Sequence, residues 1–147
     1  MNSSSLRFLI SLLLLAGSTR LNGQTAVSTS SAFTVENYYK VKWGFSEEFI
    51  SLWKKNHYPL LKMAKEKGDI LSVIAEQPRL HSGEDTRWDF KVTIVFKNAA
   101  LAFDANLTAP YKKLLYADQE KLLKDEQHRF ELLIAHWDVM TEVVPLN

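Results

Sequence analysis

The sequence predicts an α+β fold whose strands and helices follow one another in the order β-α-β-β-α-β. Four short stretches alternate apolar and polar residues, as half-buried strands do, and two longer ones repeat apolar residues every three or four positions, as amphipathic helices do. Glycine, proline or a polar loop separates most neighbouring stretches. With 147 residues, of which 46% are hydrophobic and 12% aromatic, the chain can build one domain around a packed core.

The first strand and the first long helix are predicted over residues 33–67. Apolar side chains occupy most odd positions of residues 35–43, and Gly44 ends the strand. Ser46 is the expected N-cap of the helix, and Gly68 is the residue expected just after its last turn. The apolar stripe of this helix consists of Phe49, Ile50, Trp53, His57, Leu60, Leu61 and Ala64.

A proline interrupts the second half of this helix. Pro59 has no N–H to donate and clashes with the preceding turn, which costs ~3 kcal/mol in a helix interior. We therefore expect a bend that frees carbonyl groups near residues 54–56 and directs His57 into the space between helix and sheet. A neutral imidazole can accept a proton near neutral pH, so His57 is the candidate catalytic base. The alternative is a structural histidine that only fixes the bend.

Two strands joined by a polar loop are predicted for the middle of the chain. Residues 69–78 form a β-branched run that Pro78 closes, and residues 88–97 alternate large apolar side chains with polar ones. The loop over residues 79–87 contains a Ser-Gly break. The two strands should therefore form an antiparallel hairpin.

The C-terminal part supplies the second long helix and the last strand. Asn98 is the expected cap of a short helix, a less regular stretch follows, and residues 118–133 form the charged helix before a strand that begins at Ile134. The complete order is that of the ferredoxin-like fold, a four-stranded antiparallel sheet with both main helices on one face. The expected inner side of the second helix consists of Leu122, Leu123, Phe130 and Leu133.

The sheet face opposite the helices predicts a partner subunit. The strands carry more large aromatic side chains than helices on one face can cover, and an extensive exposed apolar patch normally marks an interface. We therefore predict a homodimer with two-fold symmetry. The alternative is a monomer whose second face is covered by residues 98–116. The aromatic residues in question are Tyr39, Trp43, Trp88, Phe90 and Trp137.

The N-terminal residues predict export to the periplasm or the medium. Arg7 precedes an apolar run over residues 8–17, followed by small and polar residues, which is the order of a secretory signal peptide. The run is shorter than the ~20 residues that span a bilayer, so no membrane span is expected after processing. Processing after Ser18 and processing after Gly23 both fit. The alternative is a retained N-terminal anchor.

The predicted domain organisation follows from this reading. Residues 1–23 are the signal peptide, residues 24–32 are a small, polar, disordered leader, and residues 33–147 are the ferredoxin-like domain. The sequence contains 18 basic and 17 acidic residues and no basic stripe, so no nucleic-acid partner is expected. It has no cysteine, its four histidines lack the spacing of metal ligands, and no phosphate-binding or nucleophile motif is present. We therefore predict no metal and no cofactor.

A short motif adds a resemblance to this topology. With His57-Tyr58-Pro59 late in its first helix, the chain resembles the dimeric α/β-barrel superfamily over roughly residues 33–144, in particular its EthD, NIPSNAP and antibiotic-biosynthesis-monooxygenase groups. It is also similar to exported bacterial proteins without an assigned function. The resemblance implies a dimer of ferredoxin-like subunits, in a superfamily that includes cofactor-independent oxygenases, haem-degrading enzymes, isomerases and ligand-binding proteins. Haem held by His57 or His136 is an alternative that rests on this analogy alone.

Two functions are predicted. The first is an exported protein without catalysis that binds a small apolar or aromatic molecule, or that interacts with other proteins of the envelope. The second is a cofactor-independent enzyme, oxygenase-like or isomerase-like, with His57 as its base in an aromatic-lined cleft. The triplets Arg87-Trp88-Asp89 and His136-Trp137-Asp138 could pair across the sheet or rim this cleft. The predicted ligand-binding residues are His57, Tyr39, Trp88 and Trp137.

Overall fold

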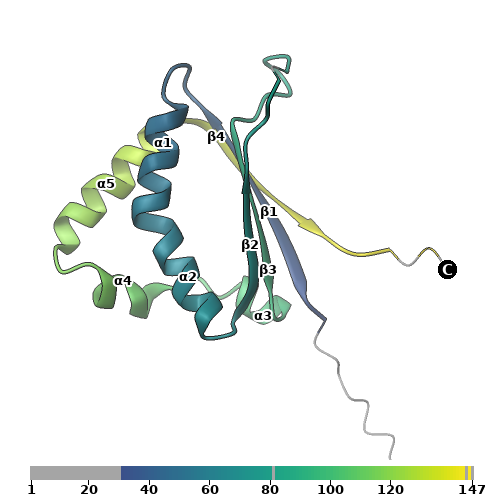
Figure 1. Cartoon of the computed structure of the whole chain (residues 1–147), viewed down its shortest axis with the longest axis vertical. Coiled ribbons are helices and arrows are strands. Elements are labelled where there is room, and N and C mark those ends of the chain that lie inside the picture. The colour runs from purple at the N-terminus through teal and green to yellow at the C-terminus, as the bar shows by residue number, and fades with distance from the viewer. Residues whose placement is uncertain (1–30, 81, 145, 147) are drawn as a thin grey trace, which may run out of the picture.

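The computed structural model describes residues 31–80, 82–144 and 146. The predicted signal peptide and all but the last two residues of the predicted leader lie outside the described residues. Figure 1 shows the helices gathered on one side of a single sheet. The elements are β1 (Phe33–Val41), α1 (Ser46–Leu52), the π-helical segment η1 (Trp53–His57), α2 (Tyr58–Glu66), β2 (Ile70–Glu76), β3 (Phe90–Phe96), α3 (Ala99–Ala102), α4 (Ala109–Leu115), α5 (Gln119–Glu131) and β4 (Leu133–Thr141).

The sheet has the strand order β2-β3-β1-β4, and each neighbouring pair is antiparallel. This order, together with the chain order of the elements, confirms the predicted ferredoxin-like fold. Residues paired directly across antiparallel strands share one face of the sheet. Tyr39 pairs with Phe90 and His136 on the helix-facing side, whereas the next residue back, Tyr38, pairs with Lys91 and Trp137 on the opposite side.

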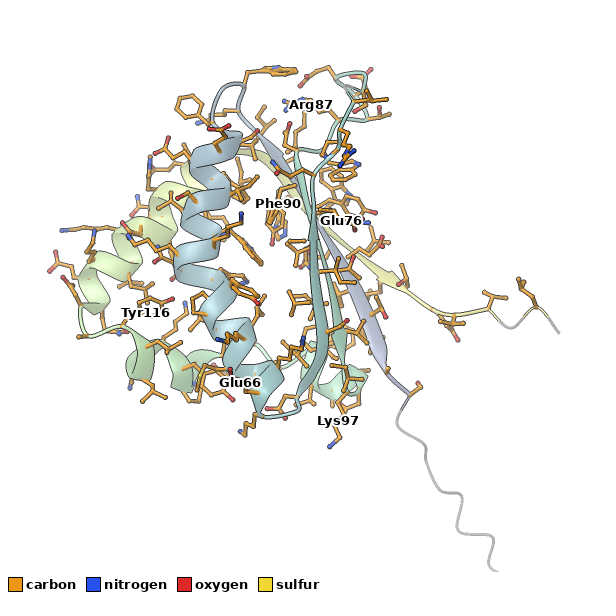
Figure 2. The ribbon with its side chains drawn as sticks, in the orientation of Figure 1. Glu66, Glu76, Arg87, Phe90, Lys97 and Tyr116 are labelled. Atoms are coloured by element: carbon orange, nitrogen blue, oxygen red, sulfur yellow. The ribbon has the colours of Figure 1, made fainter. Side chains whose placement is uncertain are left out.

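The core lies between the sheet and the first helix. Every second residue of β3 from Phe90 to Phe96 is buried, and Phe90 points from the sheet toward the helices (Figure 2). Phe49 and Trp53 meet it from the helix side, with exposed fractions of 0% and 2%. Burying a side chain of this size contributes about 1.5–3 kcal/mol, so these contacts fix the spacing between the two layers.

A π-helical turn interrupts the first helix just before the proline, at the place where the sequence predicts a bend. Residues Trp53–His57 form a π-helical turn in which the N–H of Tyr58 bonds to the carbonyl of Trp53, five residues back. Such a turn adds one residue locally and often occurs at functional sites. It ends just before Pro59, which stands in the first turn of α2 where its missing N–H is tolerated.

The expectation of free carbonyl groups near residues 54–56 is confirmed. Pro59 cannot donate to the carbonyl of Lys55, four residues back. The hydroxyl of Tyr116 lies 3.0 Å from the carbonyl oxygens of both Lys55 and Asn56 and supplies the missing donor. The segment after α4 therefore closes the defect that the proline creates.

Some element boundaries differ from the prediction. Ser46 is the first residue of α1 rather than its cap, because the chain turns at Gly44, which has a positive φ of 83°, and Phe45 takes the cap position. No side chain caps this helix end. The helix α4, expected to be irregular, begins with Pro110 in its first turn, which is a helix-start signal.

The inner face of α5 is the main error in the predicted core. Leu122 is buried as expected, but Leu123 and Phe130 are 63% and 54% exposed. Adjacent residues of a helix point about 100° apart, so Leu122 and Leu123 cannot both face inward. Arg129, seven residues after Leu122 and hence on the same face, is buried with 4% exposure.

Candidate functional site

A cavity of about 350 Å³ lies between η1 and β2, within the space that separates the helices from the sheet. Its walls from the sheet side are Val73 and Ala75, which pair with Ile94 and Val92 on the helix-facing side. Cavities that hold small ligands are of this size and are mostly apolar. The lining consists of Trp53, Lys54, Tyr58, Val73 and Ala75.

Trp53 is the rigid wall of this cavity. Its ring packs edge-on against Phe90 at 5.2 Å and stacks with Tyr58 at 6.0 Å, so two neighbours hold its orientation. Both Trp53 and Tyr58 adjoin the π-helical turn, which therefore positions the two aromatic walls. Lys54 is the single charged residue of the lining.

His57 lies beside this cavity without lining it. Its ring contacts Trp53 at 5.7 Å and is half-buried, as the position on the apolar stripe predicts. Burial, and then the nearby charges of Arg129, Lys112 and His136, lower the pKa of His57 from 6.5 to about 4. The imidazole is thus neutral at pH 7, but its affinity for a proton is too low for an efficient general base at that pH.

Tyr39 occupies the same layer on the sheet side. It is 5% exposed and stacks on His136 of β4, with ring centres 4.5 Å apart. Burial raises the pKa of Tyr39 to about 12, against the opposing effects of Arg129 and of the Trp53 indole N–H. The hydroxyl therefore stays protonated and can donate. The Trp53 N–H itself has no partner of good hydrogen-bond geometry within the described residues.

The structure divides the predicted ligand-binding residues between two faces of the sheet. His57 and Tyr39 lie between the layers, whereas Trp88 and Trp137 lie around Tyr38 on the far side. Tyr38 stacks on Trp137 at 5.4 Å and meets Trp88 edge-on at 5.8 Å. These three rings, named here the aromatic face, belong to another surface. A single cleft lined by the four predicted residues is therefore not formed.

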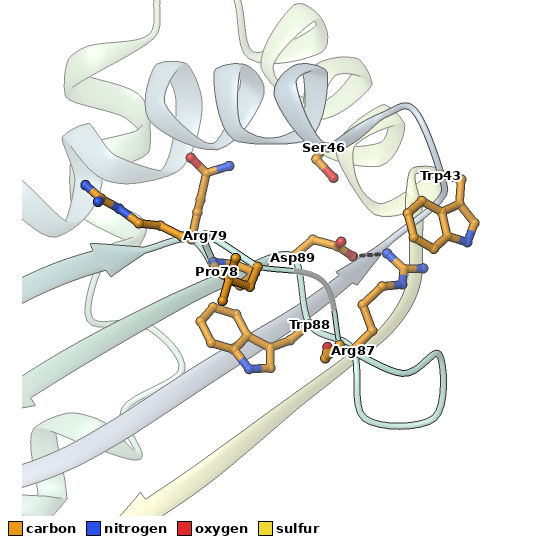
Figure 3. A pocket seen from close by; sticks show the side chains of 10 residues that line it. Trp43, Ser46, Pro78, Arg79, Arg87, Trp88 and Asp89 are labelled. Atoms are coloured by element: carbon orange, nitrogen blue, oxygen red, sulfur yellow. Dashed lines mark hydrogen bonds and ion pairs between the residues drawn. The ribbon is translucent and has the colours of Figure 1, made fainter.

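The Arg87-Trp88-Asp89 triplet forms a closed arrangement of charges at one end of the sheet. A pocket of about 240 Å³ lies there, lined by residues that include Trp43, Arg87 and Asp89 (Figure 3). Arg87 donates to Asp89 at 2.5 Å, to the Val41 carbonyl at 3.1 Å, and to Glu84 at 3.0 Å. The two charged members of the triplet thus pair with each other, and both also bond to the backbone of Val41 on β1.

The second triplet behaves in the same way. The Nε2 of His136 lies 3.2 Å from a carboxylate oxygen of Asp138, two residues along β4. Within residues 31–80, 82–144 and 146, no group of three or more His, Cys, Asp or Glu side chains is arranged to hold a metal ion. In the same part of the chain, no helix is long and apolar enough to cross a membrane.

Several solved structures are similar to this chain, with TM-scores below 0.5. No family model and no curated protein matches the sequence. Among solved structures, SnoaB, a cofactor-independent oxygenase from Streptomyces nogalater, matches with 14% identity and a TM-score of 0.47 over 76% of this chain and 92% of that one. A NIPSNAP family protein from Agrobacterium tumefaciens matches with 12% identity and a TM-score of 0.48 over 79% and 89%.

A third similar structure is a dimeric protein of unknown function and ferredoxin-like fold from Bacteroides fragilis, with 11% identity and a TM-score of 0.44 over 76% of this chain and 96% of that one. The similar structures are of the kinds that the sequence resemblance named. At these identities the likeness concerns the fold alone.

Proposed function

We propose that the protein binds a small, flat, apolar molecule in the cavity between η1 and β2. The observation that carries this proposal is the composition of the cavity wall: Trp53, Tyr58, Val73 and Ala75 are apolar or aromatic, and Lys54 is the one charged residue among them. A flat ring fits between the indole and the sheet and removes apolar surface from water, which contributes roughly 25 cal/mol for each Å² buried.

Binding without catalysis is the reading that the geometry supports. A catalytic site needs at least two polar groups directed at the reacting atoms. The lining offers the Lys54 ammonium and the Tyr58 hydroxyl, but His57, the predicted base, does not line the cavity and has a pKa of about 4. The enzymatic alternative thus gains no support from this cavity.

A pair of substitutions on β2 tests the ligand site. Ala75 lines the cavity, whereas the preceding residue, Ile74, points to the other face of the sheet and is 53% exposed. In Ala75→Phe the new ring fills the cavity, and we expect at least a tenfold loss of affinity for the uncharged fluorescent probe N-phenyl-1-naphthylamine. Ile74→Phe adds the same ring outside the cavity and should bind like the unaltered protein. Equal binding by all three proteins would exclude this cavity.

We also propose that the protein acts as a homodimer that buries the aromatic face. Tyr38, Trp88 and Trp137 form a cluster of rings on the uncovered side of the sheet, and Trp137 is 39% exposed. The matching Bacteroides fragilis protein is described as dimeric. Light scattering during gel filtration should find a dimer that Trp137→Glu converts to a monomer. Leu123→Glu, which alters an exposed residue of α5, should leave the dimer intact, and a monomeric unaltered protein would contradict the proposal.

Export is proposed from the N-terminal sequence. The basic residue, the apolar run and the small residues before position 24 support it. Mass spectrometry of the protein from its native cells should find a chain that begins at Thr19 or Gln24, outside the cytoplasm. A chain that keeps the apolar run would instead support the retained anchor.

A further inference from the structure

A buried cation without an acidic partner lies between α5 and the core. Arg129 is 4% exposed. Within the described residues its guanidinium forms no hydrogen bond and no ion pair, and its Nε is buried without an acceptor. It lies over the rings of Phe130 and Phe49, at 4.7 and 5.8 Å. Arginine is almost never fully buried unless it is paired, so its surroundings lack an anion.

Further donors surround this cation. The indole N–H of Trp53 is buried and lies close enough to the Tyr39 hydroxyl to lower its pKa, but no acceptor of good hydrogen-bond geometry faces it among the described residues. The Tyr39 hydroxyl is protonated and close enough to both Trp53 and Arg129 for each of them to affect its pKa. Buried donors in proteins are normally matched by acceptors. Among the described residues, the Arg129 Nε and the Trp53 N–H have no acceptor of good geometry.

The nearby acids are already paired. Glu126 acts on Arg129 through space, but Lys112 holds its two carboxylate oxygens at 3.0 and 3.1 Å. Asp138 contacts His136 at 3.2 Å. Neither carboxylate comes within the 4.0 Å of the Arg129 guanidinium that an ion pair requires. Among the described residues, the positive charge of Arg129 therefore has no acidic partner.

The donors lie next to an open side of the molecule. β4 is one of the two edge strands of the sheet, and its residues 134–141 are exposed although the strand has a helix-facing side. His136, on that side, stacks directly on Tyr39 and keeps 32% of its side chain exposed. In Figure 1, α5 lies beyond the first helix from β2 and β3, and β4 follows it at the edge of the sheet. The exposed strand β4 therefore lies next to Tyr39.

We propose that Arg129, together with the Trp53 indole N–H and the Tyr39 hydroxyl, binds the oxyanion of a small organic acid that enters over β4. The guanidinium supplies charge and a donor fork that matches a carboxylate, and the two neutral donors orient it. The proposal does not depend on the apolar cavity, although Trp53 belongs to both places: its ring lines the cavity and its N–H belongs to the anion site.

Benzoate and benzamide test this proposal, because they share a shape and differ in charge. Isothermal titration calorimetry in a buffer without competing carboxylates should detect benzoate binding and at least tenfold weaker binding of benzamide. Arg129→Met should weaken benzoate binding at least tenfold, whereas Arg79→Met, which removes one exposed arginine, should not change it. Trp53→Phe keeps a ring and removes the N–H, so it should weaken benzoate binding by a smaller factor.

Acetate and inorganic phosphate, titrated in parallel, distinguish an organic acid from a free anion. Tighter binding of benzoate than of either supports the organic acid, and tightest binding of phosphate contradicts it. Equal binding of benzoate and benzamide, or unchanged benzoate binding by Arg129→Met, would overturn the proposal. An Arg129→Met protein that fails to fold would overturn it as well, since the cation would then serve the fold itself.

Discussion

Arg87 and Arg129 are buried to nearly the same extent, 5% and 4% exposed, but their surroundings are opposite. Arg87 is joined to Asp89, Glu84 and the Val41 carbonyl, and it stacks on Trp43 at 4.1 Å. Arg129 has ring contacts alone among the described residues. Arg87 is thus a buried charge that stabilises the fold through its partners, whereas Arg129 is a buried charge that has no acidic partner among the described residues.

The arrangement around Arg87 ties one end of the sheet together. Asp89 accepts the N–H of Val41 at 2.7 Å, and Lys40 contacts Glu84 at 2.9 Å, so β1 and the loop before β3 are connected by charged groups. Arg87 and Lys40 together lower the pKa of Glu84 to about 2. This network gives the loop over residues 77–89 a structural role. The charged residues around the pocket in Figure 3 are therefore explained by the fold and need no ligand.

The largest expected effect is that of Arg87→Met. The substitution leaves Asp89 with a partly buried charge and removes a donor from the Val41 carbonyl. Breaking a buried pair in this way costs about 3 kcal/mol of the free energy of unfolding. Urea denaturation at pH 7 measures this loss. A change below about 0.5 kcal/mol would show that the network adds little to the fold.

The next largest effect is on the pH dependence of stability, to which Arg129 contributes through His57. Its charge, with those of Lys112 and His136, assists burial in lowering the pKa of His57 to about 4. Between pH 6.5 and pH 4 the unfolded chain therefore binds a proton that the folded protein does not, so stability falls as the pH falls through this range. Allowing for the partial exposure of His57, the loss amounts to about 2 kcal/mol.

Urea denaturation of His57→Gln at pH 7 and pH 4.5 measures this contribution, because the variant should lose less stability on acidification than the unaltered protein. The matched control is His128→Gln. Its contact with Glu48 at 2.7 Å raises the pKa of His128, so that histidine stabilises the fold when protonated, and the control should lose more stability on acidification. An identical pH dependence in all three proteins would show that His57 titrates normally.

The sequence predicts the fold well where periodicity is clear. Residues 90–96 place an apolar side chain at every second position, with Val95 as the exception on the polar face. Gly44, Gly68 and Pro78 lie just beyond the ends of elements, so the four strands and two main helices were predicted in order. The irregular helical turn before Pro59 was predictable as well, because a proline lacks the N–H that would bond to the carbonyl four residues back. The contact with Tyr116 was not predictable, because Tyr116 lies 57 positions after Pro59 in the chain.

The site was predictable only in part. His57 was placed by the helical repeat, and Tyr39 by the alternation of β1. Tyr38 blurs that alternation, and only the register with Lys91 and Trp137 shows that Tyr38 and Tyr39 belong to different faces. The burial of Arg129 has one weak signal in the sequence, its spacing of seven residues from Leu122, which places both on the same face of α5. A charged side chain is normally assigned to the surface, so this spacing is easily overlooked.

The most direct measurement of the central claim is the free energy of unfolding of Arg129→Met without any added organic acid. If the cation serves a ligand, its removal relieves an unpaired buried charge, and urea denaturation at pH 7 should find a stability equal to or above that of the unaltered protein. A loss comparable to that of Arg87→Met would show that both arginines hold the fold together, and the contrast between them would be wrong.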